Sequence, residues 1–159
     1  MNHRNLSRNQ NRVYGTIIFS SAGRILIVQG RETGKWSFPK GHKNNAEEQP
    51  LECALRETWE ESGLLLGKGY LEMLQLAAGR YFVYRLEDEP SLLSNDNNEI
   101  MDMRWVALDS LATHNNNCDI RSYVMRGHME RHKKELALHE KMENYQLEML
   151  STSMGLISV

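Results

Sequence analysis

The first third of the chain alternates short hydrophobic runs with polar turns. Residues 12–20 and 24–29 are rich in β-branched and aromatic side chains, which is typical of strands. The Ser-Ala-Gly segment at 21–23 separates the two runs and predicts a hairpin turn. Residues 36–38 form a short extended piece that ends at Pro39, because proline cannot donate a hydrogen bond to a neighbouring strand.

The periodicity of an amphipathic helix begins after a polar loop at residues 40–45. Pro50 suits the first turn of a helix, and Gly63 suits the position just after a helix ends, so the pattern predicts a helix over residues 50–62. Its less polar positions follow the i, i+3, i+4, i+7 spacing of a buried stripe: Leu51, Ala54, Leu55 and Thr58.

The second half of the chain returns to strands before it closes with helices. Strand-like runs cover residues 70–77, 80–86 and 99–108, and a polar loop covers 90–98. Asp109 is expected to cap a short helix that contains Leu111, with a linker at 114–118. Strands on both sides of one central helix, followed by a terminal helix, predict an α/β fold, an α/β/α sandwich with a mixed sheet.

A helical pattern extends from Ile120 to about Met149. Four apolar residues in it recur at the spacing of a coiled coil: Leu138, Met142, Tyr145 and Met149. We interpret this stripe as core packing, with a seam between two copies as the alternative, and a monomer is favoured. One domain is expected over residues 12–150, with flexible tails at 1–11 and 151–159.

The composition is that of an ordinary globular protein. The chain has 159 residues, 40% of them hydrophobic, which fits one domain with a full core. It contains no apolar run long enough to span a membrane, and its polar N-terminus lacks a secretory signal. Two cysteines are too few for a disulfide framework or a metal cluster. These features predict a reducing setting, the cytoplasm.

The charges are distributed unevenly. Residues 47–61 contain six glutamates and one arginine, whereas residues 121–134 contain five lysines and arginines and one glutamate. Residues 1–13 add three arginines and no acid. An acidic cluster between basic segments suggests a metal site near an anionic ligand, and solvated helix faces are the alternative.

Three of these glutamates share one face of the predicted helix. With Glu57 at 0°, a rotation of 100° per residue places Glu60 at 300° and Glu61 at 40°. Neighbours at this spacing lie roughly 5–6 Å apart, and at an effective dielectric near 20 two such charges repel by about 3 kcal/mol. A cation would offset this repulsion in a cleft, and carboxylate oxygens suit Mg²⁺ or Mn²⁺ better than Zn²⁺. An acidic face open to water is the alternative.

The segment from Gly41 to Leu64 closely resembles the Nudix box, G-x5-E-x7-R-E-U-x-E-E-x-G-U, where U is a bulky apolar residue. Residues 56–64 fit its second half, with Thr58 at an apolar position. Six residues rather than five separate Gly41 from Glu48, so either Glu47 or Glu48 takes the early glutamate position. The insertion falls in a loop, where extra residues cost little.

The resemblance implies a Nudix-type sandwich that hydrolyses a diphosphate linked to a nucleoside or similar group. It implies that Glu57 and Glu61 bind Mg²⁺ or Mn²⁺, and that Glu60 binds the metal or assists the base. The Gly41 carbonyl is implied as a further ligand. Arg56 is implied to hold a glutamate by a two-pronged ion pair and to orient it for catalysis. A simple surface ion pair is the alternative for Arg56.

Two segments outside the box extend the resemblance. Residues 36–41 resemble the W-x-F-P-K-G lead-in of Nudix enzymes that act on mRNA caps, on dinucleoside polyphosphates and on diphosphoinositol polyphosphates. There Lys40 could meet a substrate phosphate, and Trp36 could stack on substrate or pack in the core. The segment from Glu99 to Trp105 resembles an E-x5-W element, which makes Glu99 the candidate general base.

Together these patterns predict an enzyme that uses Mg²⁺ or Mn²⁺ to cleave a diphosphate bond. Its expected substrate is capped RNA or a phosphorylated small molecule such as a dinucleoside polyphosphate. Four basic residues near the C-terminus could grip an RNA backbone: Arg126, Arg131, Lys133 and Lys134. A Nudix-fold module that binds a nucleotide or RNA without catalysis is the alternative.

Overall fold

The structure is a computed structural model that describes residues 12–155. Within this range the strands are β1 (Val13–Ser20), β2 (Arg24–Gly30), β3 (Trp36–Ser37), β4 (Lys40–Gly41), β5 (Glu72–Gln75), β6 (Gly79–Leu86) and β7 (Ile100–Ala107). The helices are α2 (Pro50–Ser62), the 3₁₀ helix η1 (Leu108–Thr113), α3 (Cys118–Met125) and α4 (His128–Ser153).

The strands form one mixed sheet with the order β3-β2-β1-β6-β5. β1 runs parallel to β6 along its whole length, and the other pairings are antiparallel. β1 and β2 meet only at the pair Phe19 and Ile25. Beyond that pair β3 adds to β2, and β4 adds to the start of β1. The short β3–β4 segment is therefore held by two neighbouring strands, and this fixes the position of Lys40 and Gly41.

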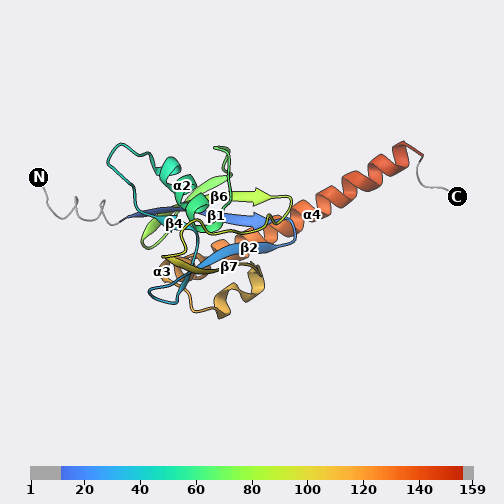
Figure 1. Cartoon of the computed structure of the whole chain (residues 1–159). Helices are drawn as coiled ribbons and strands as arrows, with labels where there is room; N and C mark the ends of the chain where they lie inside the picture. Colours follow the sequence, from blue (N-terminus) through green and yellow to red (C-terminus); the bar gives the residue numbers. More distant parts are fainter. Residues whose placement is uncertain (1–11, 156–159) are drawn as a thin grey trace, which may run out of the picture.

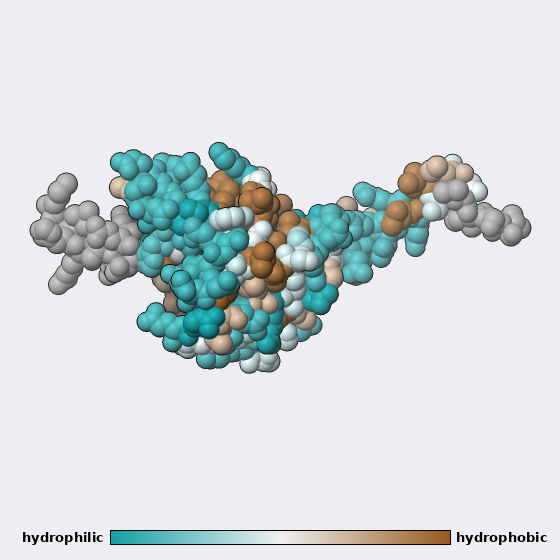
Figure 2. All heavy atoms as spheres, viewed as in Figure 1, coloured by the Kyte–Doolittle hydropathy of each residue, from teal (hydrophilic) through white to brown (hydrophobic). Residues whose placement is uncertain are grey.

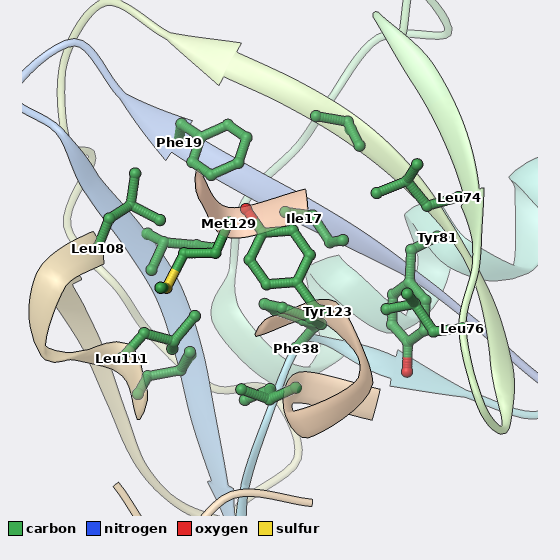
Figure 3. Packing of buried hydrophobic residues seen from close by; sticks show 14 of the residues in the cluster. Ile17, Phe19, Phe38, Leu74, Leu76, Tyr81, Leu108, Leu111, Tyr123 and Met129 are labelled. Carbon is green, nitrogen blue, oxygen red and sulfur yellow. The ribbon is translucent and has the colours of Figure 1, made fainter. Parts of the chain in front are cut away.

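Helices cover both faces of the sheet (Figure 1). On one face α2 packs on the side chains of β1 and β6, in a cluster built around Ile18, Cys53, Ala54 and Phe82. On the other face, η1, α3 and the first turns of α4 enclose a larger cluster, in which Phe38 and Tyr123 stand edge to face with ring centroids 5.3 Å apart (Figure 3). The predicted α/β/α sandwich with a mixed sheet is confirmed.

The helix predicted over residues 50–62 is confirmed with the same bounds. The single helix predicted after Ile120 is wrong, because the chain forms α3 and α4 with a break between them. The break falls at Gly127, which precedes α4 with a left-handed φ of 82°. Asp109 does not cap η1 but lies in its first turn, after the cap residue Ala107.

The structure bears on the tail expected at residues 151–159. α4 continues to Ser153, so the first part of the tail expected at 151–159 is helical. The tail expected at residues 1–11 and the last four residues of the chain lie outside the described residues. None of the helices in the described part of the chain combines the length and the apolar character that crossing a membrane requires.

The core role expected for the stripe on the C-terminal helix is wrong. Leu138, Met142, Tyr145 and Met149 are 55–62% exposed. The reason is that only the first turns of α4 lie on the sheet, and the rest of the helix leaves the body of the protein (Figure 1).

Candidate active site

The placement of α2 explains why a threonine occupies an apolar position of the box. Thr58 is fully buried against β1, where its hydroxyl lies 2.7 Å from the hydroxyl of Thr16. The Thr58 hydroxyl also lies 2.7 Å from the carbonyl of Ala54 one turn earlier. Thr58 can therefore be buried because its polar atom is satisfied within the helix and by the sheet.

A close approach between β4 and α2 brings the backbone of the loop to the carboxylates. A Cβ atom at Gly41 would overlap the carboxylate of Glu57, so only glycine leaves room for that carboxylate. One residue earlier, the backbone N–H of Lys40 donates to Glu61 at 3.0 Å. Glycine is also needed at position 15 of β1, where a Cβ atom would overlap the carbonyl oxygen of Pro39.

Arg56 ties the glutamates together. Its guanidinium makes a two-pronged pair with Glu48, with N–O distances of 2.8 and 2.9 Å. Nη1 donates to Glu57 at 2.9 Å and to Glu60 at 3.2 Å. The whole guanidinium of Arg56 therefore links three carboxylates: Glu48, Glu57 and Glu60. Glu48 also accepts from the backbone N–H of Asn44, whereas Glu47 is exposed. Glu48 therefore takes the early glutamate position that the sequence left open.

Burial makes the negative charges of this site costly. The side chain of Glu57 is only 12% exposed, and Glu61 is 3% exposed. Burial raises the pKa of Glu57 to about 7, against the opposing effect of Arg56. Burial likewise raises the pKa of Glu61 to about 8, although the Lys40 N–H stabilises its charged form. A buried carboxylate with a raised pKa is a group that a cation would stabilise.

Glu99 reaches this site from a separate part of the chain. It is exposed and immediately precedes β7. Its charge raises the pKa values of Glu57 and Glu61, which shows that it lies near both. The preceding loop is tied to the end of α2, where Asn95 donates to the backbone carbonyls of Glu60 at 2.7 Å and of Trp59 at 3.1 Å. The structure therefore brings Glu99 near Glu57 and Glu61.

The two residues expected to bind substrate have different surroundings. Lys40 is half-buried, and its charge favours the ionised form of Glu61, so its ammonium group lies at the site. Trp36 is only 6% exposed and belongs to the core on the opposite face of the sheet. The guanidinium of Arg104 lies 5.1 Å from the centre of its ring. This burial favours the packing interpretation of Trp36 over stacking on a substrate.

The donor set fits a hard divalent cation. Glu57, Glu60 and Glu61 offer carboxylate oxygens, and the Gly41 carbonyl lies beside them, where it accepts a weak hydrogen bond from the thiol of Cys53 at 3.6 Å. These are the oxygen ligands that Mg²⁺ and Mn²⁺ prefer. The buried, mutually repelling carboxylates supply the physical reason for such an ion to bind.

Sequence reasoning missed several residues that support the site. Cys53 contacts both the Gly41 carbonyl and Arg56, and burial raises the pKa of its thiol to about 12. The anchors of the Glu99 loop, Ser94 and Asn95, lie in a segment whose composition indicated only a polar loop. Their partners are distant in sequence, so no local signal could have found them.

A second group of possible metal ligands lies on the opposite face of the sheet. Glu72, His132 and Glu135 offer ligand atoms within 4.8 Å of one another. However, Arg131 pairs with both oxygens of Glu72, at 2.6 and 2.8 Å, and with Glu135 at 3.1 Å. Because a guanidinium already supplies the positive charge, we interpret this group as an ion-pair network that ties α4 to β5.

The basic segment after Ile120 is largely engaged within the protein. Arg131 belongs to the network with Glu72, and Lys133 pairs with Asp109 and with Glu130. Arg126 donates to the backbone carbonyl of Gln75 at 3.1 Å. Lys134 and Arg121 are exposed. The segment therefore offers fewer cations to an RNA backbone than its sequence indicated.

Comparison with known proteins identifies a family and several relatives of this chain. The profile of the NUDIX domain matches residues 9–126. mRNA-decapping enzyme subunit 2 of Saccharomyces cerevisiae is 26% identical over 166 residues, which cover 91% of this chain and 16% of that protein. The enzyme of the same name from Arabidopsis thaliana is 34% identical over 107 residues, 62% of this chain and 28% of that protein. The chain thus spans a minor part of the length of either relative.

A solved structure shares the fold. An Ap4A hydrolase from C. elegans superposes with a TM-score of 0.59 and 22% identity, over 79% of this chain and 98% of that one. At this identity the likeness concerns the fold alone. The family profile, however, covers most of the chain, including β1, β4, α2 and the loop that carries Glu99. The chain therefore belongs to the Nudix family.

Proposed function

We propose that this protein is a pyrophosphohydrolase that uses Mg²⁺ or Mn²⁺ to cleave a diphosphate bond in a nucleotide-linked substrate. The observation that carries the proposal is the cluster on α2, in which Glu57, Glu60 and Glu61 lie against β4 and Arg56 links the first two. A protein that only bound a nucleotide would have no need of buried carboxylates with raised pKa values.

The residues present divide the chemistry among them. Glu57 and Glu61 would hold the cation, with Glu60 and the Gly41 carbonyl as further ligands. A divalent ion held there supplies positive charge that stabilises phosphoryl oxygens and makes a nearby water easier to deprotonate. Arg56 acts as a positioning residue, because its bonds to Glu48, Glu57 and Glu60 restrict where those carboxylates point.

Glu99 is the group that we propose as general base. Water attacks one phosphorus in line with the bond to the leaving phosphate, a P–O bond forms as the bridging P–O bond breaks, and Glu99 accepts the water proton. Glu60 is the second candidate, since it is the most exposed of the helix glutamates that Arg56 contacts. Lys40 would pair with a substrate phosphate and balance its charge.

The substrate class follows from the relatives and stays a prediction. Two relatives carry the name of an mRNA-decapping enzyme, and a structural neighbour is called an Ap4A hydrolase. Both kinds of substrate contain a nucleoside joined to a chain of phosphates. We therefore propose capped RNA or a dinucleoside polyphosphate as substrate. The cytoplasm stays the compartment that we propose from the sequence.

The decisive experiment is a substrate panel assayed with Mg²⁺ and with Mn²⁺. The panel should contain capped RNA, dinucleoside polyphosphates, nucleoside triphosphates, nucleotide sugars and inositol pyrophosphates. We expect metal-dependent release of a phosphorylated product from at least one nucleotide-linked substrate. Hydrolysis of inositol pyrophosphates alone would contradict the nucleotide class, and binding without turnover of any compound would contradict the enzyme.

Two substitutions on α2 test whether its glutamates bind the metal ion that turnover requires. Glu57→Gln and Glu61→Gln keep the size of the side chain and remove its charge, so we expect turnover to fall by at least about a hundredfold. The stabilisation of the parent protein by Mg²⁺ in thermal melts should also disappear. Glu52→Gln in the first turn is the matched control and should retain activity. Near-normal turnover in both site variants would overturn the metal assignment.

A salt titration tests whether RNA is the physiological substrate. Arg121 on α3 and Lys134 on α4 are exposed basic residues, and changing both to alanine leaves the ion pairs of Arg131 and Lys133 intact. If they contact phosphates, the slope of log affinity for capped RNA against log salt should fall by about one per contact. An unchanged slope, with normal cleavage of a dinucleoside polyphosphate, would favour the small substrate.

A further inference from the structure

The outer part of α4 lacks cover from the other described elements of the protein. Every residue from 140 to 150 is exposed, and the helix projects away from the body as an arm (Figure 1). Apolar side chains nevertheless gather near the end of this arm (Figure 2). We define the arm seam as the stripe of Leu138, Met142, Tyr145 and Met149, each more than half exposed.

The arm seam is the kind of surface that a partner helix covers. Its residues are separated by four, three and four positions, which places all of them within a narrow strip along one side of the helix. A helical arm without tertiary contacts is only marginally stable in water, because its stability must come from packing of its apolar side. A continuous apolar strip on such an arm marks an interaction surface.

We propose that α4 pairs with α4 of a second copy of this chain in an antiparallel, two-fold symmetric arrangement. A two-fold axis beside the bond between Glu143 and Asn144 places Leu138 level with Met149 of the partner subunit. The same axis places Met142 level with Tyr145 of the partner subunit. Each apolar residue of the arm seam then meets an apolar residue, and the larger pair, Met142 with Tyr145, lies at the centre.

The charges beside the arm seam favour the antiparallel direction. In this arrangement Lys141 flanks the seam next to Glu148 of the partner subunit, and symmetry repeats the pair. In a parallel arrangement Lys141 would instead face Gln146 of the partner subunit. In the parallel arrangement, extending the seam toward the body would also place Glu135 beside Glu135 of the partner subunit. The two negative charges would repel each other. Antiparallel pairing further places the two bodies at opposite ends of the helix pair.

The end of the arm has a second apolar side, which faces away from the arm seam. Leu150 and Met154 are more than half exposed and lie on the side of α4 that carries Leu136 nearer the body. Leu136 and Leu71 line a cavity of about 250 Å³ between the sheet and α4. Because this side and the cavity both point away from the arm seam, the proposed pairing uses the arm seam alone.

Analytical ultracentrifugation of the full chain, from micromolar to several hundred micromolar, tests the proposal. We expect the parent protein to sediment as a dimer that dissociates on dilution. Met142→Glu places a charge in the arm seam and should produce a monomer. The matched control is Leu147→Glu, which changes an equally exposed residue on the opposite side of the same helix and should leave the dimer intact.

A charge reversal tests the direction of pairing. Lys141→Glu turns two attractive pairs into two repulsive ones and should weaken the dimer by roughly tenfold, whereas the double change Lys141→Glu and Glu148→Lys should restore it. Hydrolysis of a small substrate should be normal in all these variants, because α4 lies on the face opposite α2. A monomeric parent, equal effects of Met142→Glu and Leu147→Glu, or no effect of Lys141→Glu would each overturn the proposal.

Discussion

At the scale of single residues, the site depends on the absence of a side chain at Gly41. Gly41→Ala would place a Cβ atom on the Glu57 carboxylate, which must then leave its bond to Arg56. We expect turnover to fall at least about tenfold, with a matching loss of stabilisation by Mg²⁺ in thermal melts. Gly69→Ala, where a Cβ atom meets nothing within 4 Å, should leave both unchanged. Equal behaviour of the two variants would contradict this role for Gly41.

The raised pKa values of two carboxylates predict an unusual pH dependence for the metal-free protein. The pKa of Glu57 is about 7 and that of Glu61 about 8, whereas the ordinary value is 4.5. Because the folded state binds protons more tightly than the unfolded chain, this contribution to stability is full below pH 4.5 and is lost as pH rises through 7 and 8.

The measurement is the melting temperature in a chelator from about pH 5 to about pH 9. We expect the parent to lose more stability over this range than the double variant Glu57→Gln and Glu61→Gln. Added Mg²⁺ should stabilise the parent most at the alkaline end, where the carboxylates are already ionised. The same pH profile for parent and double variant would show that these groups do not titrate as their burial indicates.

Individual site residues were predictable where their signal is local. Rotation along a helix was enough to place Glu57, Glu60 and Glu61 together, and the structure has them so. The surroundings of Thr58 and Trp36 were not predictable in this way, because each depends on a partner from another element. The hydroxyl of Thr16 forms a hydrogen bond with that of Thr58 in the core. The guanidinium of Arg104 covers the ring of Trp36.

At the scale of elements, the network around Arg131 decides how α4 sits on the sheet. Arg131→Met keeps much of the side-chain volume and removes the two bonds to Glu72. Both side chains are partly exposed, so we expect the free energy of unfolding to fall by about 1 kcal/mol. Arg121→Met on the exposed surface is the control. Urea denaturation measures the difference, and equal values for both variants would contradict a structural role for Arg131.

The bounds of a helix were predictable where residues typical of helix ends mark both its start and its finish. Pro50 and Gly63 bracket α2, and the structure begins and ends that helix where they indicate. The end of α3 carried only Gly127, which a helical pattern tolerates, so α3 and α4 read as one helix. The exposure of the stripe on α4 could not be predicted from the sequence for a different reason. Heptad spacing shows that a helix has an apolar side, but not whether its own sheet extends far enough to cover it.

At the scale of the whole molecule, the site joins two segments that are about 40 residues apart in the sequence. α2 carries three glutamates, and the loop before β7 carries Glu99. Asn95 holds that loop to the last turn of α2 through two backbone carbonyls. Sequence spacing could not place Glu99 beside Glu57, and only its resemblance to a family element indicated it. Such loops often move during turnover, so Glu99 can approach the attacking water when the loop closes.

Glu99→Gln therefore separates proton transfer from metal binding. General-base assistance contributes typically 10²–10⁴-fold, so we expect kcat to fall within that range. The Mg²⁺ concentration for half-maximal stabilisation should change little, because Glu57 and Glu61 are intact. The acid limb of the pH–rate profile, measured at saturating metal, should shift or disappear, since that limb in the parent reports ionisation of the base. A variant that keeps the parental kcat across pH would exclude Glu99 as the base and leave Glu60 as the candidate.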